Sequence, residues 1–179
     1  MRGMEFSIRF IDEGGNTMNM TIEDSAFIPY VVETYSDMIV RIAYQSLQSQ
    51  AEAEDVAQDV FMRLLQQRSF QNEAHMKAWL IRVTVNRCKD VIKSSWFRTA
   101  MPLSEETILF SEEQKGILAE LWTLSKNDRT VLYLYYYEGY SVPEISKILK
   151  TKENTISSRL TRARKKLKEV LLKGAYQYE

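Results

Sequence analysis

Apolar residues recur at spacings of three and four along most of the chain, which is the period of an amphipathic helix. These runs predict helices over residues 26–48, 51–67, 77–94, 112–124, 128–137, 143–149 and 152–172. Only three prolines and six glycines interrupt the 179 residues. We therefore expect an all-α fold.

Residues 95–111 contain Pro102 and follow no helical period, so we interpret them as a flexible linker. Two small helical domains are expected on its two sides, the first over residues 26–94 and the second over residues 112–173. Residues 1–25 fit neither domain. They are either a flexible N-terminal extension or, in part, a stretch that precedes a true start at Met18 or Met20.

The second domain contains the signals of a helix-turn-helix. Ser141 and Glu144 have the spacing of a capping box, and Pro143 suits the first turn of the helix that follows. That short helix ends before Lys150, and Thr151 can cap the next one. Two helices separated by a tight turn predict the helix-turn-helix outline.

The last predicted helix has one apolar side and one polar side. Opposite its apolar stripe stand short polar residues, with cations on the flanks, as suits a recognition helix in a major groove. A solvated face usually mixes glutamate with lysine, but no acidic residue lies between Asn154 and Lys168. The candidate DNA-binding residues are Asn154, Thr155, Ser157, Ser158, Arg159, Thr161, Arg162, Arg164 and Lys165.

The helix over residues 51–67 carries an acidic and polar stripe opposite its apolar one. Asp55, Gln58, Asp59 and Met62 share this face, at helical spacings. Such a stripe is either solvated or a docking face for a basic partner. In the second case its charges set how fast the partner is encountered and in which register it binds.

The helix over residues 77–94 combines an aromatic residue with cations on its polar side. An aromatic face that stacks a base and cations that hold the backbone are typical of single-strand binding. The alternative is that Trp79 packs into the core. The candidate residues are Trp79, Arg82, Asn86, Lys89 and Lys93.

Three segments together resemble bacterial sigma factors of the extracytoplasmic-function (ECF) group: residues 53–61, residues 79–90 and residues 124–167. The resemblance implies that the stripe on residues 51–67 binds the β′ clamp helices of core RNA polymerase, with further contacts to the β subunit. It implies that the 77–94 helix and the loop over residues 68–76 open and read the minus-10 element, and that the helix-turn-helix reads the minus-35 element. It also implies an anti-sigma factor as a partner. Two departures are Asn154, where the family usually has glycine, and Ser157, where it often has lysine or arginine.

Charge distribution adds to the case for two different partners. The formal net charge is zero, yet the chain from Lys147 onward contains ten basic residues and only three acidic ones. Acidic residues gather instead around Asp55 and Asp59. A basic end and an acidic patch predict one partner of each charge.

Other function classes find little support in the sequence. The single cysteine, Cys88, excludes an internal disulfide, and no apolar run approaches the ~20 residues of a membrane span. The only histidine, His75, falls in a predicted loop, and no nucleophile lies at a spacing from it that would indicate a catalytic pair. We expect a cytoplasmic protein without membrane insertion, enzymatic activity, metal or cofactor. The alternative is a stand-alone helix-turn-helix regulator with an N-terminal sensing or dimerisation domain, which would not need the acidic stripe.

Overall fold

The computed structural model describes residues 8–11, 17–20, 24–67, 69–95 and 122–175. A short antiparallel hairpin comes first, formed by β1 (Ile8–Ile11) and β2 (Thr17–Met20), with Ile8 opposite Met20. β1 lies against α3 (Glu73–Ser95). The sequence predicted no element here, because four-residue strands leave too short a period to detect.

Three helices form the N-terminal bundle: α1 (Phe27–Leu47), α2 (Gln50–Leu64) and α3. Each packs against the other two, and the pair α1 and α2 is joined by a tight turn at Gln48, whose φ is 58°. The Ser49 hydroxyl accepts a hydrogen bond from the Glu52 amide and so caps α2. Ile39, Leu64 and Leu80, one from each helix, are fully buried between them.

The C-terminal module contains α5 (Lys126–Tyr136), α6 (Val142–Leu149) and α7 (Glu153–Ala175). Its core is built from Leu134, Ile145 and Ile156, again one from each helix and each fully buried. Gly139, at φ 74°, makes the turn from α5 to α6, and Lys150, at φ 49°, makes the turn from α6 to α7. This arrangement confirms the predicted helix-turn-helix and the all-α character of both domains.

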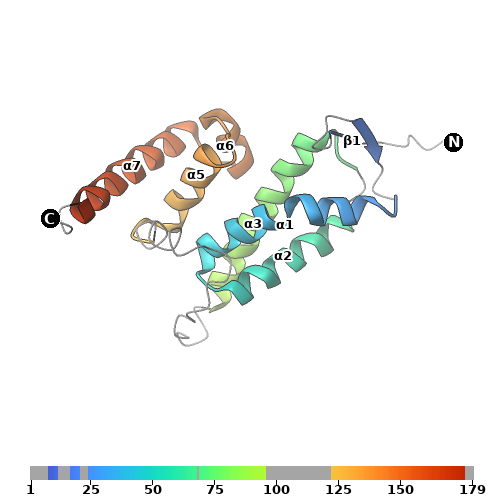
Figure 1. Ribbon diagram of the computed structural model, residues 1–179, viewed down its shortest axis with the longest axis horizontal. Coiled ribbons are helices and arrows are strands. Elements are labelled where there is room, and N and C mark those ends of the chain that lie inside the picture. Colours follow the sequence, from blue (N-terminus) through green and yellow to red (C-terminus); the bar gives the residue numbers. More distant parts are fainter. Residues whose placement is uncertain (1–7, 12–16, 21–23, 68, 96–121, 176–179) are drawn as a thin grey trace.

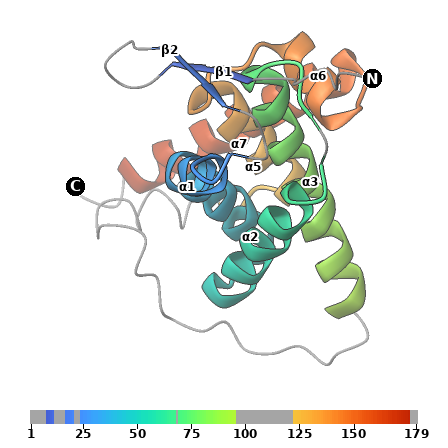
Figure 2. The same ribbon diagram turned by 90° about the vertical axis from the view of Figure 1, so that its right-hand side faces the viewer.

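The two modules lie against each other, with α1 beside α5 and α3 beside α6 (Figures 1 and 2). One buried side chain, Arg129 of α5, spans the junction. Its guanidinium donates to the Gln45 carbonyl of α1 at 2.9 Å and to the Leu124 carbonyl at 2.5 Å, and it stacks over the Trp122 ring at 4.7 Å. Burial lowers the pKa of Arg129, and these bonds compensate for the lost hydration.

The start of α3 and the segment before α5 differ from the sequence prediction. α3 begins at Glu73 rather than 77, because the Asn72 side chain accepts from the His75 amide at 2.8 Å and caps the helix there. His75 is consequently helical, and the prediction of a loop at this residue was wrong. Residues 122–124 form a turn before α5, and the rest of the helix predicted over 112–124 lies outside the described residues. The linker assigned to 95–111 also lies outside them, apart from Ser95, which ends α3.

The cap predicted at Thr151 was wrong as well. The Thr151 hydroxyl donates to the Leu149 carbonyl at 3.2 Å, and α7 begins only at Glu153. The hydroxyl therefore closes the end of α6 instead of opening α7.

Cys88 is buried in the N-terminal core, and burial raises the pKa of its thiol to about 12. Because the thiolate is the reactive form, we expect the folded protein to resist alkylation by iodoacetamide at pH 8. Denaturation should restore rapid modification. Mass spectrometry of the two samples checks this, and rapid labelling of the native chain would contradict the placement of Cys88.

Candidate nucleic-acid and protein interfaces

The polar face of α7 is free of the rest of the protein over its first three turns. Asn154, Ser157, Ser158, Thr161 and Lys165 are all exposed, whereas Ile156, Leu160 and Ala163 on the opposite side are buried. The structure thus brings the predicted DNA-binding residues onto one accessible surface. Thr155 and Arg159 lie at its margins and are half-buried.

The hydroxyls on this face are held by the helix itself. Ser158 donates to the Asn154 carbonyl at 2.7 Å, and Thr161 donates to the Ser157 carbonyl at 3.0 Å. Because the hydroxyl hydrogens are used in these bonds, the exposed oxygens can still accept hydrogen bonds from base amino groups.

The flanking cations differ in how strongly the protein holds them. Arg162 makes a loose ion pair with Asp128 at 3.6 Å and stays 65% exposed at its side chain. Arg164 donates to the Tyr136 hydroxyl at 2.8 Å and stacks over the Tyr135 and Tyr136 rings. Arg162 is thus free to reach a phosphate, while Arg164 is directed toward α5.

The capping box at the start of α6 positions the helix-turn-helix. The Glu144 carboxylate accepts from both the amide and the hydroxyl of Ser141, at 2.8 and 2.5 Å. These hydrogen bonds hold the pKa of Glu144 below its usual range.

Replacing Glu144 with glutamine should therefore destabilise the chain in a pH-dependent way. A depressed carboxyl pKa stabilises the fold above the unfolded pKa, about 4.3, and this contribution is lost as pH falls through the folded value. The wild type should exceed Glu144→Gln in unfolding free energy at pH 7, and the two should converge near pH 3. Urea unfolding at both pH values measures this, and an equal difference at both would contradict the role of the carboxylate.

On α3, the structure separates the predicted residues into two groups. Asn86, Lys89 and Lys93 are exposed on the outer face. Trp79 is half-buried, with its ring edge-on to Phe70 at 5.5 Å between centroids, and Arg82 is turned toward α6. Trp79 therefore matches neither base stacking alone nor core packing alone. One part of its ring packs against the protein, and another part remains accessible.

The segment that leads into α3 is tied to the helix by contacts that the sequence analysis missed. Phe70 is 3% exposed and lies between the rings of Trp79 and His75. The Gln71 amide donates to His75 Nδ1 at 3.3 Å. The only signal in the sequence was Asn72, a residue type suited to cap a helix that begins at residue 73.

The α2 stripe is accessible, and α2 makes no extensive contact with the C-terminal module. Asp55, Gln58 and Met62 are exposed, Met62 by 59%. Asp59 differs, because it accepts from Arg87 Nε of α3 at 2.5 Å and is therefore partly engaged within the bundle. Leu65, 54% exposed just after α2, extends the apolar part of this face beyond the predicted residues.

The described residues contain no group of three or more histidine, cysteine or acidic side chains that could hold a metal ion. Among the same residues, no helix combines the length and hydropathy that crossing a bilayer requires.

Sequence comparisons match both modules to one family. The profile of sigma-70 region 2 matches residues 31–98, and that of sigma-70 region 4 matches residues 116–167. The chain is 28% identical over 162 residues to the ECF RNA polymerase sigma factor SigW of Bacillus subtilis, covering 79% of this chain and 87% of that protein. It is 27% identical to the probable RNA polymerase sigma factor RfaY of Xanthomonas campestris, covering 79% of this chain but only 40% of the relative.

The fold also resembles solved structures. The sigma factor RpoE in complex with the anti-sigma factor NepR from Bartonella quintana matches with a TM-score of 0.70 at 23% identity, over 83% of this chain and 98% of that one. CnrH, solved in complex with the cytosolic domain of CnrY, matches with a TM-score of 0.57 at 22% identity, over 83% and 90% of the two chains.

Proposed function

Because the chain belongs to the ECF group of sigma-70 family RNA polymerase sigma factors, we propose a division of labour among its exposed faces. The α2 stripe (Asp55, Gln58, Asp59 and Met62) binds the β′ clamp helices of core polymerase. The outer side of α3 holds the opened minus-10 strand, and the polar face of α7 reads the minus-35 element. One observation carries this proposal. Sigma-70 regions 2 and 4 match the two modules in that order, and each module has an accessible face whose chemistry suits its proposed partner.

The charges and exposures on these faces support the assignment. On α7, exposed hydroxyls lie beside Arg162 and Lys165, which suits base edges flanked by phosphates. On α3, Lys89 and Lys93 can follow a single-stranded backbone. The acidic α2 stripe is chemically unsuited to DNA and suits a basic protein partner.

The domain division follows from the same features. We propose residues 26–94 as the polymerase-binding and minus-10 domain, residues 112–173 as the minus-35 domain, and residues 95–111 as the linker. We also propose that the chain acts by binding and carries out no chemistry of its own, with polymerase as the catalyst. The cytoplasm is its proposed location. An anti-sigma factor is a further proposed partner, supported by the structure of RpoE from Bartonella quintana, which was solved in complex with the anti-sigma factor NepR.

Start-site mapping with purified components tests this function. Core polymerase is incubated with a pool of genomic fragments, with and without the chain, and the 5′ ends of the transcripts are sequenced. The proposal predicts new start sites that share motifs near minus 10 and minus 35. A stand-alone regulator would bind duplex fragments but add no start sites with core polymerase alone, and that result would contradict the proposal.

A further inference from the structure

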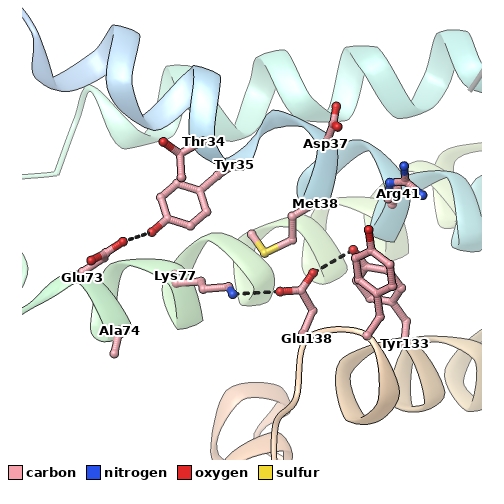
Figure 3. A pocket seen from close by; sticks show the side chains of 11 residues that line it. Thr34, Tyr35, Asp37, Met38, Arg41, Glu73, Ala74, Lys77, Tyr133 and Glu138 are labelled. Carbon is pink, nitrogen blue, oxygen red and sulfur yellow. Dashed lines mark hydrogen bonds and ion pairs between the residues drawn. The ribbon is translucent and has the colours of Figure 1, made fainter. Parts of the chain in front are cut away.

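Of the three methionines in the described helices, only Met62 of α2 is exposed to solvent. Its side chain is 59% exposed, whereas Met38 of α1 is 6% exposed and Met76 of α3 is fully buried. Figure 3 shows Met38 between Tyr35 and Glu138, on the wall of a cleft lined by α1, α3 and the end of α5. A dissolved oxidant must reach a sulfur atom before it can react with it. Met62 is therefore the methionine of these helices that oxidation should modify first.

Met62 supplies an apolar side chain to a stripe that is otherwise acidic and polar. The stripe's other members are Asp55, Gln58 and Asp59, and Leu65, 54% exposed, lies three residues beyond Met62. A thioether is apolar and polarisable, and methionine is enriched at protein interfaces. Burial of Met62 against a partner is thus expected to contribute to docking on this face.

An open cleft of about 710 Å³ lies beside Met62, and several hydrogen-bond donors line it. Among them are Arg63, Gln66 and Arg87. A guanidinium carries five N–H groups, and Arg87 uses the one on Nε for its bond with Asp59 at 2.5 Å. A thioether sulfur is a weak acceptor, so these donors are of little use to the reduced side chain. A sulfoxide oxygen is a much better acceptor, and the cleft suits it.

From the exposure of Met62 and the donors beside it, we propose that Met62 is an oxidation switch for polymerase docking. Hydrogen peroxide transfers one oxygen atom to the Met62 sulfur: the O–O bond breaks, an S=O bond forms and water leaves. The sulfur loses two electrons, and the peroxide gains them. The polar sulfoxide turns toward the donors of the cleft and no longer offers an apolar surface to the partner. This inference rests on the proposed function of the α2 stripe.

Two substitutions at Met62 test the switch. Met62→Leu keeps an apolar side chain of similar size but has no sulfur to oxidise. Met62→Gln introduces a polar carbonyl oxygen without any oxidant, as a mimic of the sulfoxide. Met38→Leu is the matched control, because it removes a buried methionine and leaves Met62 in place.

The full-length wild type and variants are treated with hydrogen peroxide, the oxidant is removed, and peptide mass spectrometry locates the sulfoxides. Titration of labelled core polymerase then compares each protein before and after oxidation. The wild type and Met38→Leu should each lose about tenfold in affinity, because a polar group replaces an apolar one at the interface. Methionine sulfoxide reductases for both epimers should restore that affinity. Met62→Leu should keep the affinity that it has before oxidation, and Met62→Gln should bind as weakly as the oxidised wild type without treatment.

Two results would overturn the inference: a wild-type chain with Met62 fully oxidised that binds polymerase as before, or an equal loss for Met62→Leu on oxidation. Modification of Met76 before Met62 in the folded chain would also contradict it. Asp55→Lys keeps these outcomes apart from failure of the proposed function. If Asp55→Lys weakens docking and oxidation of Met62 does not, the switch alone is refuted. If neither change affects polymerase binding, the assignment of the α2 stripe to polymerase fails as well.

Discussion

Replacing Asp55 with lysine should weaken binding to core polymerase by about 10- to 100-fold, because a like-charge contact at an interface costs several kcal/mol. Asp55 is exposed at the N-terminal end of the α2 stripe, and the structure gives its carboxylate no partner within the described residues. The fold should consequently keep its stability. Titration of labelled core polymerase, with thermal unfolding of the free chain alongside, measures both effects.

Glu54→Lys is the matched control for Asp55→Lys. It makes the same charge change on the adjacent residue of α2, but Glu54 points to a different side of the helix, where it accepts from Gln50 at 2.9 Å. Equal losses for both variants would mean that total charge, rather than the stripe, governs docking. Asp59→Lys is less suitable as a test, because it also breaks the ion pair with Arg87.

Ser158→Glu should reduce binding to a minus-35 duplex by about 100-fold, because it places a carboxylate where the backbone phosphates and base acceptors line the groove. Glutamate is a good helix former, so α7 should remain intact. The wild-type hydroxyl is exposed and bonded only to its own helix, so no packing is lost. Electrophoretic mobility shift with a duplex from the start-site mapping measures the change.

Thr34→Glu serves as the control for Ser158→Glu. It adds the same charge at an exposed position of α1, far from α7 in sequence and outside all proposed DNA faces. Binding by Thr34→Glu should equal that of the wild type. A similar affinity for Ser158→Glu and the wild type would remove α7 from the minus-35 contact.

Sequence periodicity predicted the helices well where apolar stripes are long. α1, α2, α6 and α7 begin and end close to the predicted residues, because each has a continuous buried side. The prediction failed at the start of α3, where the cap at Asn72 and the buried Phe70 extend the helix by a turn without any apolar period. Contacts of this kind depend on tertiary packing, which a single window of sequence does not contain.

The candidate binding faces, like the helices, could be predicted where a helix has a regular apolar stripe. Exposure of Ser158, Thr161 and Lys165 could be predicted because they lie opposite a regular apolar stripe. The positions of Arg82 and Asp59 could not be predicted, since both polar groups are held by partners distant in sequence: the α6 carbonyls and Arg87. A helical wheel shows which side of a helix is polar, but not which polar groups the fold itself engages.

Promoter opening is the step that distinguishes a sigma factor from a duplex-binding regulator. Permanganate oxidises unstacked thymines, so it reports strand separation on a promoter found by start-site mapping. We predict reactive thymines around minus 10 when core polymerase and the chain are both present, and none with either component alone. A duplex that stays unreactive with both components, although the chain remains bound to it, would contradict the account.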